Sequence, residues 1–168
     1  MTDIPQLVSS YFLRDDNAYG CAETTYMVLK KIFGLRNPMD SSPAMVFNGG
    51  VAYSGGLCGA LTGAALAIGE LAGREIADHQ RAKREARKVM QRVVEQFIQH
   101  FGSSRCMELT GYDFTIEGAH HRFIEDRTWR VTCTAQIVFV VQFLADCSFT
   151  EAAEREIPQP SCGQTLDH

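Results

Sequence analysis

The clearest periodic pattern in the chain covers residues 78–101. Apolar residues recur there at helical spacing, while charged and amide side chains fill the other side. This pattern is typical of an amphipathic helix whose apolar stripe packs on a core. Gly102 follows at once and is well placed to end the helix. The stripe consists of Ala82, Ala86, Val89, Val93, Phe97 and Phe101.

Weaker patterns predict shorter helices elsewhere in the chain. We expect helices over residues 6–13 and 21–33, and a Gly- and Ala-rich helix over residues 57–72 that Gly73 ends. A further short helix is expected to carry Cys106, because a Gly-Ser-Ser turn precedes it.

The second half of the chain gives mixed signals. Asp113 or Thr115 is expected to cap a helix that runs to about Glu125. Residues 128–147 contain many β-branched residues, which favour a strand locally, but the length of the run without Gly or Pro favours a buried helix. We predict the helix. The sequence therefore predicts an all-α fold, a compact multi-helix bundle built around the Gly- and Ala-rich helix.

This bundle is expected to be a single domain over residues 1–156. A chain of 168 residues with 45% hydrophobic content is enough for one well-filled core. Residues 148–151 read Ser-Phe-Thr-Glu, which fits a capping box for a short last helix. Residues 157–168 are expected to be a disordered tail.

Composition excludes several classes of protein. With a net charge of -4 the chain lacks the excess of basic residues that is typical of nucleic-acid-binding proteins, so no nucleic-acid partner is expected. No run reaches the roughly 18 to 20 unbroken apolar residues of a membrane span. The first residues do not resemble a secretory signal, and a cytoplasmic location is predicted.

Cysteines are the main candidates for chemistry. In a cytoplasmic chain that is large enough to fold without disulfides, several cysteines indicate metal binding or redox chemistry. Three of them follow a glycine-containing segment and open a predicted helix, where partial positive charge stabilises a thiolate or an anionic cofactor and lowers the thiol pKa. The alternative is that they are small buried hydrophobic residues. The three are Cys21, Cys58 and Cys106, and the remaining cysteines are Cys133, Cys147 and Cys162.

The order of the cysteine motifs resembles a known family. The motifs are Tyr-Gly-Cys-Ala-Glu-Thr at residues 19–24, Cys-Gly-Ala-Leu-Thr-Gly at residues 58–63, Cys-Met-Glu-Leu-Thr-Gly at residues 106–111, and Cys133. This order resembles the family of redox-active proteins that is described by a Cys-Gly-Ala-x-x-Gly motif and four characteristic cysteines. It is also similar to the non-haem iron–sulfur domain of split-Soret cytochrome c.

The resemblance implies a site of four cysteines. Carried over by position, the ligands are Cys21, Cys58, Cys106 and Cys133, with Cys147 as a substitute for the last. The implied cofactor is an iron–sulfur cluster, with 2Fe–2S favoured, used in electron transfer or redox sensing. Four thiolates also suit zinc in a structural or interaction module, and the same thiols without metal suit thiol–disulfide chemistry. No Cys-x-x-Cys-His occurs, so no haem is expected.

Other features add little to this interpretation. The glycines at positions 49, 50, 55 and 56 indicate backbone that needs positive φ or close approach, and would bring N–H groups near the sulfurs. His120 and His121 have no partner at metal-ligand spacing and are expected on the surface. We expect a redox partner protein of unknown identity and leave open both a homodimer and whether the protein is an enzyme.

Overall fold

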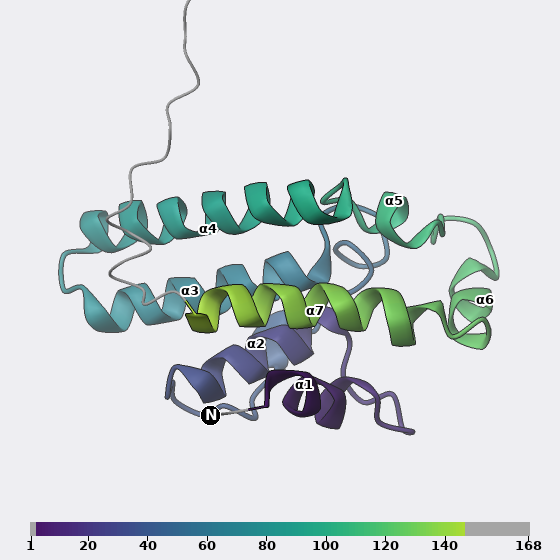
Figure 1. The fold of residues 1–168 in the computed structure, drawn as a ribbon, viewed down its shortest axis with the longest axis horizontal. Helices are drawn as coiled ribbons and strands as arrows, with labels where there is room; N and C mark the ends of the chain where they lie inside the picture. The colour runs from purple at the N-terminus through teal and green to yellow at the C-terminus, as the bar shows by residue number, and fades with distance from the viewer. Residues whose placement is uncertain (1–2, 147–168) are drawn as a thin grey trace, which may run out of the picture.

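The computed structural model describes residues 3–146, and these residues confirm the all-α fold class (Figure 1). The described range holds seven α-helices and one 3₁₀ helix, and its only strand-like pairing is an isolated bridge. The helices are α1 (Ile4–Phe12), α2 (Cys21–Ile32), α3 (Gly59–Glu75), α4 (His79–Phe101), α5 (Cys106–Thr110), α6 (Ala119–Glu125) and α7 (Thr128–Asp146), and the 3₁₀ helix is η1 (Ser42–Ala44).

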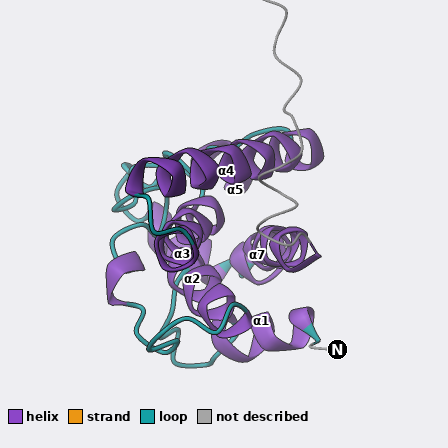
Figure 2. Cartoon of the chain, turned by 90° about the vertical axis from the view of Figure 1, so that its left-hand side faces the viewer, coloured by secondary structure: helices purple, strands orange, loops and turns teal. Residues whose placement is uncertain are grey.

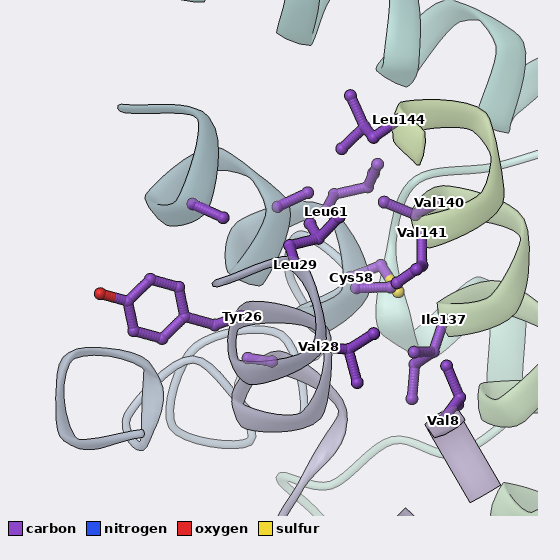
Figure 3. Close-up of a cluster of buried hydrophobic side chains, with 14 of the residues drawn as sticks. Val8, Tyr26, Val28, Leu29, Cys58, Leu61, Ile137, Val140, Val141 and Leu144 are labelled. Atoms are coloured by element: carbon purple, nitrogen blue, oxygen red, sulfur yellow. The ribbon is translucent and has the colours of Figure 1, made fainter. Parts of the chain in front are cut away.

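The Gly- and Ala-rich helix α3 lies at the centre of the bundle, as predicted. It packs against α2 on one side and α4 on the other, and α7 runs alongside and contacts α1, α2, α3 and α4 (Figure 2). Fully buried aliphatic side chains from α2, α3 and α7, such as Val28, Leu61 and Val140, fill the space between these helices (Figure 3).

The boundaries of α4 follow the sequence signals closely. The Asp78 carboxylate accepts a hydrogen bond from the backbone N–H of Arg81 at 2.7 Å and caps the first turn. Gly102 takes the left-handed conformation, with φ +83°, and ends the helix. The predicted helix over residues 78–101 is therefore confirmed.

The end predicted for α3 was wrong. Gly73 lies inside the helix, which continues to Glu75 before Ile76 takes an extended conformation. Arg74 and Glu75 are good helix formers, and they carry the helix past the glycine. A Cβ atom built on Gly73 would meet no atom within 4 Å, so this glycine has no packing role.

Gly73→Ala is therefore expected to stabilise the protein by about 0.5–1 kcal/mol, because alanine restricts the unfolded chain and clashes with nothing in the helix. Urea unfolding of the two proteins measures the difference. A midpoint equal to or below that of the parent would contradict the expectation.

The predicted cap of the helix before residue 125 was also wrong. Asp113 accepts hydrogen bonds from the backbone N–H and the hydroxyl of Thr115, at 3.0 and 2.6 Å, and closes a local turn. Such side-chain turns compete with helix formation. The helix α6 begins later, after Gly118, whose φ is +76°.

The helix α7 belongs to the core of the bundle. It is the one helix in the described part of the chain that is long and apolar enough to cross a membrane by length and composition alone. Core helices of folded domains pass the same test, and the side chains of Ile137, Val140 and Val141 are fully buried. The absence of a membrane span remains a prediction.

Several predictions concern residues outside the range 3–146. They are the capping box at residues 148–151, the tail at residues 157–168 and the domain boundary between them. Cys147 and Cys162 also lie outside the described residues.

Candidate functional site

Four cysteines come from four separate segments of the bundle. Cys21 is the first residue of α2, Cys58 is the N-cap of α3, and Cys106 is the first residue of α5, so the three predicted positions at helix N-termini are confirmed. Cys133 lies in the second turn of α7. All four are free thiols, and all but the partly buried Cys21 are buried.

A short stretch of paired backbone aligns two of these cysteines. One isolated antiparallel bridge joins the loop before α3 to the loop before α5. The N–H of Cys58 donates to the carbonyl of Ser104 at 2.8 Å, and the N–H of Cys106 donates to that of Gly56 at 2.6 Å. Cys58 and Cys106 are thus diagonal neighbours, a relation with a typical Cα separation of roughly 7–8 Å. A separation of that size disfavours a disulfide between such neighbours.

The sulfur of Cys21 lies against the first residue of α3. A Cβ atom built on Gly59 would fall 2.2 Å from Sγ of Cys21, so only glycine leaves room for the thiol at this point. Backbone N–H groups, including that of Gly49, are placed to hydrogen-bond with this sulfur. The N-terminal ends of α2 and α3 therefore meet at one thiol.

The glycine-rich loop after η1 has an unusual backbone. Gly49, Gly50 and Gly55 have positive φ, as the sequence predicts, and so do three residues between them, Val51, Ala52 and Tyr53. Each non-glycine residue in this conformation costs roughly 1–2 kcal/mol. Backbone hydrogen bonds within the loop hold the turn, such as the one from the N–H of Gly55 to the carbonyl of Gly49 at 3.0 Å. The result is that Tyr53 lines a cavity beside the cysteines.

This cavity has a volume of about 290 Å³ and opens to solvent. Cys21, Cys106 and Cys133 line it together with aromatic side chains. Cys58 does not line the cavity but lies within the buried hydrophobic cluster (Figure 3), where its Sγ donates to Oε1 of the buried Gln136 at 3.4 Å. The structure thus brings all four predicted cysteines to one region.

The expectation of lowered thiol pKa values was wrong. Burial raises the pKa of Cys106 from its ordinary value of 9.0 to about 12, and the charge of Cys21 adds to the effect. Burial is also the largest cause that raises the pKa values of Cys21, Cys58 and Cys133, and the charges of neighbouring cysteines contribute for the last two. The loss of hydration raises the thiol pKa values more than the helix N-termini lower them. In the metal-free protein the thiols therefore stay protonated at neutral pH.

Stability of the metal-free protein is expected to fall at alkaline pH. A thiol whose folded pKa is raised keeps its proton while the same thiol in the unfolded chain loses it, so the contribution of Cys106 to stability is constant below about pH 9 and falls toward pH 12. Each such thiol contributes a slope of about 1.4 kcal/mol per pH unit in that range. Urea unfolding at pH 8 and pH 10 under a reducing atmosphere tests this. A Cys106→Ser variant should show a shallower slope, and an equal slope would contradict the assignment.

The cysteines are not arranged around a single ion. Within residues 3–146, no set of three or more His, Cys, Asp or Glu side chains is placed to hold one metal ion. Of the two histidines expected on the surface, His121 pairs with Glu125 at 3.1 Å. His120 is exposed but also lines the cavity, where its ring lies 4.6 Å from that of Tyr53. No pattern in the sequence predicts this role of His120.

The fold and the site define a helical protein with a buried group of cysteine thiols beside an open cavity. The chain belongs to the family described as "Putative redox-active protein (C_GCAxxG_C_C)", which matches residues 19–147. It is thus a member of a redox-active family. No curated protein and no solved structure matches the chain. The similarity to split-Soret cytochrome c therefore stays a prediction.

Proposed function

We propose that Cys21, Cys58, Cys106 and Cys133 bind an iron–sulfur cluster, with 2Fe–2S favoured, and that the protein serves in electron transfer or redox sensing in the cytoplasm. The observation that carries the proposal is that four free thiols from four segments gather at one buried region, three of them on the wall of a cavity. A redox partner protein, not yet identified, would exchange electrons with this site.

The residues present fit such a cofactor in their chemistry. Thiolates are the ligands of iron–sulfur clusters, and four of them hold a 2Fe–2S cluster. When bound, such a cluster supplies a one-electron carrier. Three of the thiols start helices, whose N-termini would offset the negative charge of thiolates and cluster. The backbone N–H of Gly49 would hydrogen-bond to the sulfur of Cys21, as such donors do around clusters.

Zinc is supported less well than a cluster. A structural zinc ion needs four ligands at one tetrahedral centre. The described residues offer no three side chains in that arrangement. In a 2Fe–2S cluster each iron takes two of the four thiolates, so the sulfurs need not meet at one point.

Thiol–disulfide exchange is also supported less well. Its nucleophile is the thiolate, which reactive cysteines reach by a lowered pKa. Burial raises the pKa of all four thiols here. The diagonal relation of Cys58 and Cys106 also disfavours a disulfide between them.

Anaerobic purification from iron-replete cells tests the proposal. We expect about two iron and two sulfide ions per chain, a brown colour and a paramagnetic signal after one-electron reduction. Colourless protein without iron after anaerobic reconstitution would overturn it. One zinc per chain without iron would favour the structural site, and a gain of two free thiols on mild reduction would favour disulfide chemistry.

A further inference from the structure

The cavity beside the cysteines has aromatic walls. Among the described residues, six Phe, Tyr and Trp rings from α1, α6, α7 and three loops line it, and several of them touch one another. The centroids of Tyr53 and Phe114 are 5.8 Å apart, and those of Phe114 and Phe123 are 5.2 Å apart. Walls of this kind favour a flat, largely apolar ligand. The six residues are Phe12, Tyr19, Tyr53, Phe114, Phe123 and Trp129.

The cavity wall carries few charged side chains. Among the residues that the structure describes, Glu23 is the only Asp, Glu, Lys or Arg on its wall, where His120 also lies. Both oxygens of its carboxylate are occupied, because Oε2 accepts from the backbone N–H of Gly20 and from Nδ2 of Asn48, both at 2.9 Å, and Oε1 accepts from the hydroxyl of Ser41 at 3.0 Å. A neutral ligand fits this wall better than a charged one.

Trp129 lines the cavity, and its buried indole N–H is an unsatisfied hydrogen-bond donor. Trp129 is only 6% exposed, and its indole N–H has no partner among the described residues. An indole nitrogen can only donate, and buried donors normally have an acceptor. A ligand with a carbonyl oxygen would supply that acceptor.

We propose that this cavity binds a small, neutral, planar aromatic carbonyl compound of the quinone class, held by the aromatic walls and by a hydrogen bond from the indole N–H of Trp129. A volume of about 290 Å³ is near the lower end for ligand pockets and limits the ligand to one or two rings. The choice of a redox-active ring rests on the proposed function, because Cys21, Cys106 and Cys133 line the same cavity. The binding itself does not require a cluster.

The test uses the cluster-free, reduced full-length chain and duroquinone, whose four ring methyl groups block addition of thiols. The sequence has one tryptophan, so the labelled protein gives one indole N–H resonance in an NMR spectrum. We expect a saturable shift of this resonance. Trp129→Phe keeps a ring but loses the donor, and it should weaken duroquinone binding roughly 3- to 10-fold, followed through backbone resonances.

Two further variants separate the aromatic wall from general effects on the fold. Phe114→Ala should weaken binding, because Phe114 lines the cavity. Phe139→Ala is the matched control, since Phe139 is a similarly half-buried aromatic residue that does not line it. Its affinity for duroquinone should equal that of the parent.

Two outcomes would overturn the inference: no saturable shift up to about 1 mM duroquinone, or equal affinity in the Trp129→Phe variant. Iron and sulfide are measured on a separate sample. Iron without quinone binding therefore rejects this inference alone, and quinone binding without iron rejects the cluster alone.

Discussion

Serine in place of Cys58 is expected to abolish binding of the proposed cluster. The substitution removes one thiolate ligand, and loss of a direct ligand should exceed the roughly 10- to 100-fold loss of affinity seen when a residue that only supports a ligand is replaced. The serine hydroxyl can still donate to Gln136, as the thiol does, so the fold should persist. Iron and sulfide per chain after anaerobic purification measure the effect, and circular dichroism checks the fold.

Matched serine variants sharpen this experiment. Cys162→Ser should keep the full iron content. Cys133→Ser and Cys147→Ser test which of these two is the fourth ligand, and the position of Cys133 on the cavity wall favours Cys133. Full iron content in Cys58→Ser, or its loss in Cys162→Ser, would contradict the assignment.

Gly63→Ala is expected to destabilise the protein by about 3 kcal/mol or more. A Cβ atom on Gly63 would lie 2.3 Å from the carbonyl oxygen of Ala22 and 3.0 Å from Cβ of Thr25, so α3 would be pushed away from α2. The obstacle is backbone, which cannot rotate aside, and overpacking of this kind commonly costs about 1–3 kcal/mol even where side chains can move. Urea unfolding measures the loss.

Gly69→Ala is the control for this substitution. Gly69 lies in the same helix, but nothing is within 4 Å of the position of its Cβ, so alanine should stabilise the helix slightly. Equal stability of the Gly63 and Gly69 variants would contradict the close contact between α2 and α3.

Helices with a strong apolar stripe could be predicted from the sequence, and those without one could not be bounded accurately. The helix α4 follows its stripe from the Asp78 cap to Gly102. The position of Gly73 misled the prediction for α3, because glycine ends a helix only where the chain can turn away. The residues of α7 form a helix although their β-branched side chains favour a strand locally, because the helix is buried against several neighbouring helices.

The cysteines of the candidate site could be predicted from the sequence, but their pKa values could not. The glycine-containing turns predicted that Cys21, Cys58 and Cys106 lie at the starts of helices, as they do in the structure. The family resemblance added Cys133 to the predicted site. Their pKa values depend on hydration, which a linear sequence does not reveal, and burial reversed the expected direction.

The aromatic cavity could not be predicted because its residues share no period. Tyr53 sits on an irregular loop, Phe114 on a turn and Trp129 on the first turn of α7. Only the packing of α1, α6 and α7 brings such residues together. An unpaired indole N–H likewise becomes visible only in three dimensions.

The spread of the four cysteines along the chain has a consequence for biosynthesis. A ribosome releases Cys21, Cys58 and Cys106 before Cys133, which belongs to the last helix of the described range. Until α7 emerges and packs on α1, α2, α3 and α4, three of the thiols in the nascent chain are not yet buried by this helix. Insertion of the proposed cluster is therefore expected to follow translation, and slow elongation in aerated cells should raise the share of oxidised protein without a cluster.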